Sequence, residues 1–150
     1  MMRLFRPLLS VMLVLVTTLL VSCSSPTKAK IPTVYSPEKI AQLQQFRTPI
    51  AEARGEMDTL KALIDKENWV DARTFIHGPL GELRQDMSII SKKLLLKDQK
   101  PARDLAKDLF FDFDKIDFAA KERDAIGAKN GYSRAIADFD AYLDLIPSNS

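Results

Sequence analysis

Residues 68–95 read NWVDARTFIHGPLGELRQDMSIISKKLL, and their apolar side chains recur at steps of three or four positions. This spacing places them on one face of an α-helix, so the stretch predicts one long helix with a single buried seam. The seam comprises Trp69, Ala72, Ile76, Leu80, Leu83, Met87, Ile90 and Leu94. Asn68 is a good N-cap. Pro79 follows Gly78 and removes one backbone hydrogen bond, so we expect a kink there without a break.

A buried seam of this length requires partner helices, and the preceding residues supply the first. Ser36 suits an N-cap, Pro37 the first helical position and Glu38 the first turn. Apolar residues then recur at helical spacing: Ile40, Leu43, Phe46, Ile50, Ala53, Met57, Leu60 and Ile64. Pro49 lies inside this pattern, where we expect it to kink the helix and not to end it.

Two further helices follow residue 95. The first has Asp98 as its predicted cap and Pro101 in its first turn, and its predicted core face is Ala102, Leu105, Leu109, Phe113, Ile116 and Ala120. The second carries Tyr132, Ile136, Phe139, Leu143 and Ile146 and ends at Pro147. Its start is ambiguous, because local turn chemistry favours Asn130 and Gly131. We choose Asp124, since a later start leaves a much shorter helix. Gly127 and Gly131 then fall in its first two turns, which we expect to fray.

Four helices joined by short turns predict an all-α fold, an antiparallel up-down four-helix bundle over residues 36–150. The N-terminal residues do not belong to it. Residues 1–22 resemble a lipoprotein signal peptide, because Arg3 and Arg6 precede an apolar run too short for a spanning helix of about 20 residues. The run ends in Leu-Val-Ser before Cys23, which is the only cysteine.

Cys23 is the predicted lipidation site, with an incidental cysteine after an ordinary signal peptide as the alternative. Residues 23–35 contain serine and proline without periodicity, which predicts a lipidated, flexible tether. Removal of residues 1–22 takes two of the 22 basic residues and none of the 20 acidic ones, leaving 20 of each sign. The processed chain is therefore near neutral, and electrostatic recognition must come from local patches.

Catalytic and cofactor motifs are absent from the sequence. His77 is the only histidine, and no Glu-x-x-His pair or C-x-x-C-H motif is present. Gly78 and Gly81 lie in a helical pattern that follows no strand, which argues against a phosphate loop. The aspartates at 112, 114 and 117 lack the spacing of a calcium loop, so we interpret them as a solvated helix face. We therefore predict a protein that binds a partner, with no enzymatic activity and no cofactor.

Basic residues give the first candidate contact surface. Lys97, Lys100, Arg103 and Lys107 gather at the predicted start of the third helix, where the helix dipole disfavours cations. A feature that local stability opposes suggests a docking patch for an acidic protein surface. The alternative is a merely soluble helix end.

Three other side chains are candidate partner contacts. His77 precedes the predicted kink, and three roles are open for it. It could donate a hydrogen bond to a carbonyl freed by Pro79, contact a partner, or bind a metal together with ligands from elsewhere in the chain. Phe111 and Phe118 lie seven residues apart, on a different face from Phe110 and Phe113. They are either an exposed aromatic pair that a partner covers or part of a wide core stripe.

The run RTFIHGPLGELRQDM, with Trp69 before it and KDQKPA after it, resembles the cyanobacterial PsbQ lipoprotein family. YSPEKI at residues 35–40 and DFDAYLDLIP at residues 138–147 fit the same family. The resemblance implies an extrinsic subunit on the lumenal side of photosystem II, lipid-anchored to the thylakoid membrane. It would stabilise the oxygen-evolving complex and its calcium and chloride requirement. The alternatives are an envelope lipoprotein that docks another membrane complex, and a metal-binding helical bundle.

Overall fold

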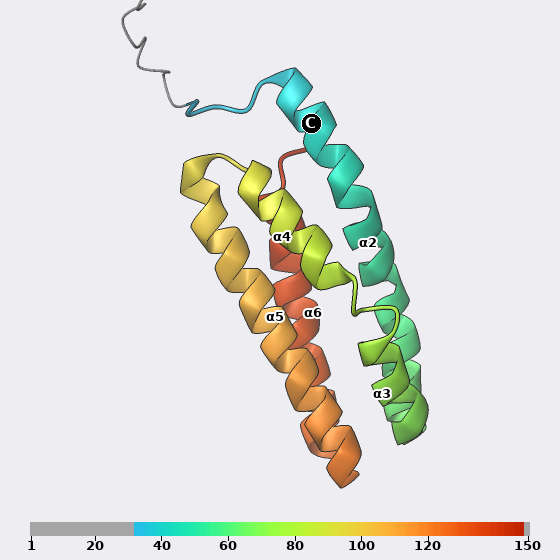
Figure 1. Ribbon diagram of the computed structural model, residues 1–150. Coiled ribbons are helices and arrows are strands. Elements are labelled where there is room, and N and C mark those ends of the chain that lie inside the picture. The colour runs from blue at the N-terminus through green and yellow to red at the C-terminus, as the bar shows by residue number, and fades with distance from the viewer. Residues whose placement is uncertain (1–31, 149–150) are drawn as a thin grey trace, which may run out of the picture. The chain divides into compact units, whose positions relative to one another are not determined.

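The computed structural model describes residues 32–148, and these residues form five helices and no strand. The helices are α2 (Pro37–Asp65), α3 (Trp69–His77), α4 (Leu83–Lys93), α5 (Leu96–Glu122) and α6 (Ala125–Leu145) (Figure 1). None of these helices is long and apolar enough to cross a membrane. The predicted signal peptide, Cys23 and most of the predicted tether lie outside the described residues.

Helix α2 begins as predicted. The Ser36 side chain accepts a hydrogen bond from the Lys39 amide at 3.2 Å, and Pro37 is the first helical residue. The helix continues through Pro49, which is exposed. A proline there leaves the Gln45 carbonyl without its helical partner, but Gln45 is also exposed, so water can supply the missing hydrogen bond. The expectation that Pro49 does not end the helix is confirmed.

The prediction of one kinked helix over residues 68–95 is wrong, because the chain leaves the helical path between α3 and α4. Gly78 has φ −93° and ψ −95°, and Pro79 has no amide hydrogen to continue the ladder. The turn makes its own bonds instead: the Leu80 amide reaches the Phe75 carbonyl at 3.5 Å, and the Gly81 amide reaches the Gly78 carbonyl at 2.9 Å.

The apolar seam nevertheless continues across this break. Every member of the predicted seam is buried except Trp69, which is partly buried. Asn68 caps α3 as predicted, and its side chain accepts from the Asp71 amide at 3.4 Å. Hydrophobic spacing thus identified the buried face correctly, although it did not show that two helices share that face.

Helix α5 begins at Leu96, two residues before its predicted cap, so the prediction that Asp98 caps it is wrong. Asp98 lies in the first turn and accepts a hydrogen bond from the Tyr35 hydroxyl at 2.7 Å. That hydroxyl also accepts from the Leu95 amide at 3.1 Å. Tyr35 therefore fixes the chain before α2 to the start of α5, and Pro101 falls in the second turn of that helix.

Helix α6 begins after Asp124, whose side chain accepts from the Gly127 amide at 2.9 Å, as predicted. The expected fraying of its first turns stays a prediction, but Gly131 has a packing role in the second turn. Gly131 is buried, and a Cβ atom there would lie only 2.8 Å from Cγ1 of Ile116. The glycine lets α6 approach α5 closely. Tyr132 and Ile136 are only partly buried, and the buried face instead includes Ala128, Ala135 and Tyr142.

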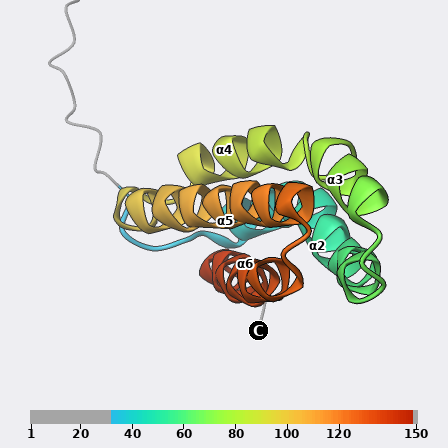
Figure 2. The same ribbon diagram turned by 90° about the horizontal axis from the view of Figure 1, so that it is seen from below.

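The helices contact one another in a closed ring. Helix α6 lies against α5 and α2, while α3 and α4 both lie against α2 and α5 (Figures 1 and 2). The core that they enclose draws buried side chains from all five helices. Its polar centre is Tyr142, whose hydroxyl donates to the Met87 carbonyl at 2.7 Å and lies 3.0 Å from the Ser91 hydroxyl.

Candidate docking surface

The predicted basic residues all lie exposed on α5, but their local partners differ. Lys100 forms an ion pair with Asp104 one turn later, which partly neutralises its charge. Arg103 and Lys107 line a groove of about 200 Å³ between α4 and α5. Because α5 begins at Leu96, only Lys97 lies in its first turn, and the dipole effect fades within one turn. The dipole argument is therefore wrong for Lys100, Arg103 and Lys107.

Helix α4 adds a cation that sequence reasoning missed. Arg84 lines the same groove, with its guanidinium carbon 4.0 Å from the centre of the Phe110 ring. Arg84, Arg103 and Lys107 form no ion pair with any residue in the range 32–148. The α4–α5 groove, as we call it, thus combines three free cations with an aromatic wall. Arg84 could not be grouped with the others from spacing, because it lies on a different helix.

His77 does not donate to a carbonyl freed by Pro79. Its Nε2 atom lies 2.9 Å from Oδ1 of Asp117 on α5, and the Nε atom of Arg73 lies 2.9 Å from the same oxygen. Burial alone would raise the pKa of Asp117, but the hydrogen bonds from Arg73 and His77 hold that pKa below its ordinary value. These contacts join α3 to α5.

The interpretation of the three aspartates as a solvated face is also wrong in part. Asp112 is buried, with its Oδ1 atom 2.9 Å from Nε of Arg134 on α6. Asp114 is exposed, as predicted. Two of the three carboxylates therefore connect helices. In the part of the chain that the structure describes, no group of three or more histidine, cysteine or acidic residues could hold a metal ion.

Phe111 and Phe118 are 57% and 64% exposed. The interpretation that they belong to a wide core stripe is therefore wrong, and they lie on a different, exposed face of α5. The Lys115 ammonium lies 4.1 Å from the centre of the Phe111 ring. Phe118 lines a hollow of about 340 Å³ between α5 and the start of α6. The candidate residues therefore do not form one site. His77 lies between α3 and α5, Phe118 between α5 and α6, and Arg103 with Lys107 between α4 and α5.

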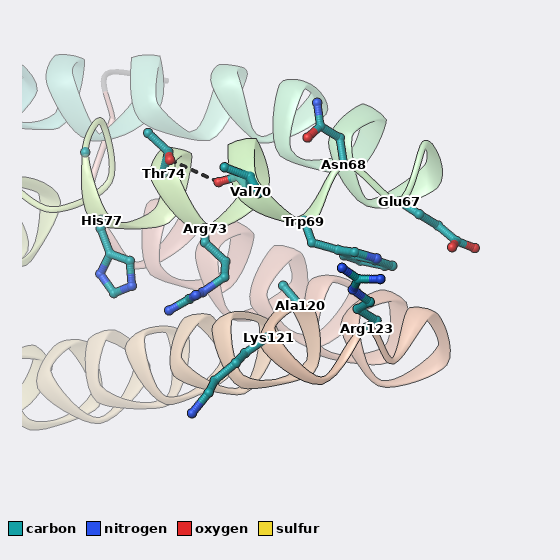
Figure 3. Close-up of a pocket in the computed structure, with 11 residues that line it drawn as sticks. Glu67, Asn68, Trp69, Val70, Arg73, Thr74, His77, Ala120, Lys121 and Arg123 are labelled. Atoms are coloured by element: carbon teal, nitrogen blue, oxygen red, sulfur yellow. Dashed lines mark hydrogen bonds between the residues drawn. The ribbon is translucent and has the colours of Figure 1, made fainter.

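A larger groove, of about 1080 Å³, lies between α3 and the last turns of α5, and we call it the α3–α5 groove (Figure 3). Sequence reasoning did not find it, because its walls come from residues about 50 positions apart. Its lining comprises Glu67, Asn68, Trp69, Val70, Arg73, Thr74, His77, Gly78, Ala120, Lys121 and Arg123. In Figure 3 the Trp69 indole points toward the Arg123 guanidinium, while Arg73 and His77 extend from α3 toward α5.

The sequence is similar to a known family and to several of its members. Residues 6–147 match the PsbQ family model, described as oxygen evolving enhancer protein 3. The chain is 56% identical over 146 residues to CyanoQ of Synechocystis sp., a match that covers 97% of each chain. It is 26% identical over 104 residues to the chloroplastic oxygen-evolving enhancer protein 3 of Chlamydomonas reinhardtii, covering 69% of this chain and 52% of that protein. The chloroplastic oxygen-evolving enhancer protein 3-1 of Arabidopsis thaliana is 25% identical over 92 residues, covering 61% of this chain and 41% of that protein.

Proposed function

The chain belongs to the PsbQ family of oxygen evolving enhancer proteins, and from this premise we propose that it is a non-catalytic extrinsic subunit of photosystem II. In this role it stabilises the oxygen-evolving centre and its calcium and chloride requirement by binding the complex on its lumenal side. The high identity to CyanoQ over nearly the whole chain supports this function, as do the names of the two chloroplastic relatives.

The proposed architecture for this role is an antiparallel up-down four-helix bundle in which α3 and α4 together form the second arm. The ring of contacts supports it, since α3 and α4 both lie between α2 and α5. Contacts between α2 and α6 support the antiparallel direction. Arg54 pairs with Asp140 at 2.7 Å and Asp65 with Lys129 at 3.3 Å, so residue numbers rise along α2 as they fall along α6.

The α4–α5 groove carries the proposed docking function. Arg84, Arg103 and Lys107 have no ion-pair partner among residues 32–148, so they are free to meet carboxylates. An acidic surface of a photosystem II subunit is the complementary partner, because opposite charges steer docking and fix its register. Lys97 and Lys100 extend the same cationic stripe along α5.

Attachment to the membrane is a separate proposal, in which Cys23 carries the lipid on the lumenal side of the thylakoid. Two acyl chains provide stable anchoring that one chain does not. Cys23→Ser is expected to release the protein from thylakoid membranes or to leave it unprocessed. A Cys23→Ser protein that is cleaved and retained like the wild type contradicts lipid anchoring.

Docking is tested by co-isolation with detergent-solubilised photosystem II, so that lipid attachment does not mask a lost contact. Replacing Arg84, Arg103 and Lys107 together by glutamine is expected to lower co-isolation at low salt. The wild-type association is expected to weaken as salt rises, because the Debye length falls from about 10 Å at 0.1 M to about 3 Å at 1 M.

A matched control replaces Lys39, Lys61 and Lys66 by glutamine, which gives the same change in net charge. None of these three lysines lines the α4–α5 groove or joins two helices by an ion pair. This control is expected to co-isolate like the wild type. Equal loss in both triple variants means that net charge acts and the α4–α5 groove does not. A wild-type chain that fails to co-isolate at any salt concentration contradicts the photosystem II assignment itself.

A further inference from the structure

The α3–α5 groove differs from the α4–α5 groove in its balance of charge and apolar surface. Asp117 forms an ion pair with Arg73 and lies within hydrogen-bond distance of His77, so the charge of Arg73 is largely neutralised. Lys121 and Arg123 form no ion pair with another residue of the described range, and Glu67 is the only acidic residue in the lining. Two free cations therefore line the groove on the α5 side: Arg123 lies toward the Trp69 indole, whereas the Lys121 side chain extends away from α3 (Figure 3).

The apolar part of the groove comes from the start of α3. Trp69 is partly buried against the core, and Val70 is 75% exposed. Both residues line the groove opposite Lys121 and Arg123. Tryptophan and arginine are enriched at the centres of protein interfaces, because they combine a large contact area with directed polar groups.

Backbone geometry singles out the same groove. Glu67 has φ 52° and Arg123 has φ 58°, and no other residue of the described part of the chain has a positive φ. Helices commonly end with glycine in this left-handed conformation, since a Cβ atom makes it unfavourable. Here both positions keep a charged side chain, and both side chains line the α3–α5 groove. Local stability does not favour either side chain. Glu67 would repel an acidic ligand, so only the cationic Arg123 is expected to make a contact outside the chain.

We propose that the α3–α5 groove binds an acidic segment of a partner protein, with an apolar side chain against Trp69 and carboxylates on Lys121 and Arg123. The charge complementarity of two free cations selects the acidic segment, and the concave aromatic wall selects a peptide with an apolar anchor. This contact is additional to the α4–α5 groove and does not depend on the photosystem II assignment. It lies at the end of the domain where the α2–α3 and α5–α6 turns meet, whereas Tyr35 is fixed to the other end of α5.

Trp69 is the only tryptophan of the chain, so its fluorescence reports directly on this groove. The full chain is titrated with the peptide acetyl-Asp-Glu-Phe-Glu-Asp-amide, which lacks tryptophan. Saturable binding with a shift of the Trp69 emission to shorter wavelength is expected. The peptide with serine in place of phenylalanine is expected to bind about tenfold more weakly, the effect of one lost interaction of about 1.4 kcal/mol. The peptide with asparagine and glutamine in place of all four acids loses both carboxylate contacts and is expected to bind at least about tenfold more weakly.

Two glycine variants distinguish the effect of the side chain on peptide binding from the effect of backbone strain at a positive φ. Arg123→Gly is expected to weaken peptide binding by about tenfold while the melting temperature stays the same or rises. Glu67→Gly relieves the same kind of backbone strain but removes a negative charge, so it is expected to bind the acidic peptide as well as the wild type or better. Arg123→Gln keeps a long side chain without the charge and is expected to repeat the loss of binding in a folded chain.

Three results would each overturn this inference. In the first, the uncharged peptide binds as tightly as the acidic one. In the second, Arg123→Gln keeps wild-type affinity for the acidic peptide, and in the third, Trp69 emission shifts with vesicles of anionic phospholipid but not with the acidic peptide. The last result identifies the groove as a membrane contact. Because no photosystem II is present in the assay, these results are independent of the proposed function.

Discussion

At the scale of single residues, the least predictable feature is the polar group inside the core. Tyr142 and Ser91 are both buried, and both hydroxyls contact the Met87 carbonyl, at 2.7 and 2.6 Å. Burial raises the pKa of Tyr142, and it is the largest cause of that shift. Hydrophobic spacing marks Met87 as buried but does not reveal that its carbonyl accepts two side-chain hydrogen bonds. Such a contact depends on how α6 packs against α4, which no local pattern records.

We predict that Tyr142→Phe lowers the free energy of unfolding by about 1 kcal/mol, because one buried hydrogen bond is lost while Ser91 still satisfies the Met87 carbonyl. Chemical denaturation followed by far-ultraviolet circular dichroism measures this change. Tyr132→Phe is the matched control, since Tyr132 is only partly buried and removal of its hydroxyl is expected to change stability little. Equal effects in the two variants would contradict a structural role for the buried hydroxyl.

Tyr35 predicts a loss of stability at alkaline pH. Burial and the hydrogen bond to Asp98 raise the pKa of Tyr35 from 10.0 to about 12. A folded-state pKa above the unfolded value means that the neutral phenol stabilises the fold fully below about pH 10, and that this contribution is lost as pH rises through about 12. Tyr35→Phe is therefore expected to be less stable at neutral pH and to show a shallower alkaline decline. Urea unfolding between about pH 9 and about pH 12 tests this, and an unchanged slope in the variant refutes it.

At the scale of elements, capping and periodicity predicted where most helices lie. Ser36, Asn68 and Asp124 cap α2, α3 and α6 as expected, because an N-cap is a local feature written in a few residues. The break after His77 was missed because the apolar spacing stays in phase across it. The start of α5 was missed because the helix has no side-chain cap for a local pattern to reveal. The amide of Leu95, just before the helix, instead donates to the hydroxyl of the distant Tyr35.

Two helix glycines predict opposite responses to the same substitution. A Cβ at Gly55 would meet nothing within 4 Å, whereas one at Gly131 would lie 2.8 Å from Cγ1 of the buried Ile116. Gly55→Ala is expected to stabilise the protein by about 0.5–1 kcal/mol, because alanine loses less conformational entropy in a helix. Gly131→Ala is expected to destabilise it by about 1–3 kcal/mol, because α5 and α6 must move apart. Thermal unfolding measures both, and stabilisation by Gly131→Ala would show that the close approach of these helices is not required.

At the scale of the whole molecule, α5 is the element that the three grooves described above share. The α4–α5 groove contains Arg103 and Lys107, and the hollow between α5 and α6 contains Phe118. The α3–α5 groove contains Lys121 and Arg123. The sequence placed Lys97, Lys100, Arg103 and Lys107 together, and Phe111 with Phe118 on a separate face, because such groupings depend on one helix alone. It left open whether the two phenylalanines are exposed. It could not identify Arg84 or the Trp69 wall, because their position next to α5 follows from the packing of α3 and α4.

The Asp117 contacts predict how α3 detaches at acid pH. Burial opposes ionisation of Asp117, but its hydrogen bonds from Arg73 and His77 are stronger in effect and lower its pKa. A folded-state pKa below the unfolded value means that the stabilisation is present above the ordinary carboxyl pKa of about 4 and is lost as pH falls through the folded value. Trp69 begins α3, so its emission is expected to move to longer wavelength below about pH 4, before total helix content falls. Asp117→Asn should show the shift already at neutral pH. Asp104→Asn, which removes a carboxylate paired only within α5, should behave like the wild type. Asp117→Asn could instead have the same Trp69 emission maximum as the wild type at neutral pH, and the same shift at the same acid pH. In that case the contacts of Asp117 with Arg73 and His77 do not hold α3 in place.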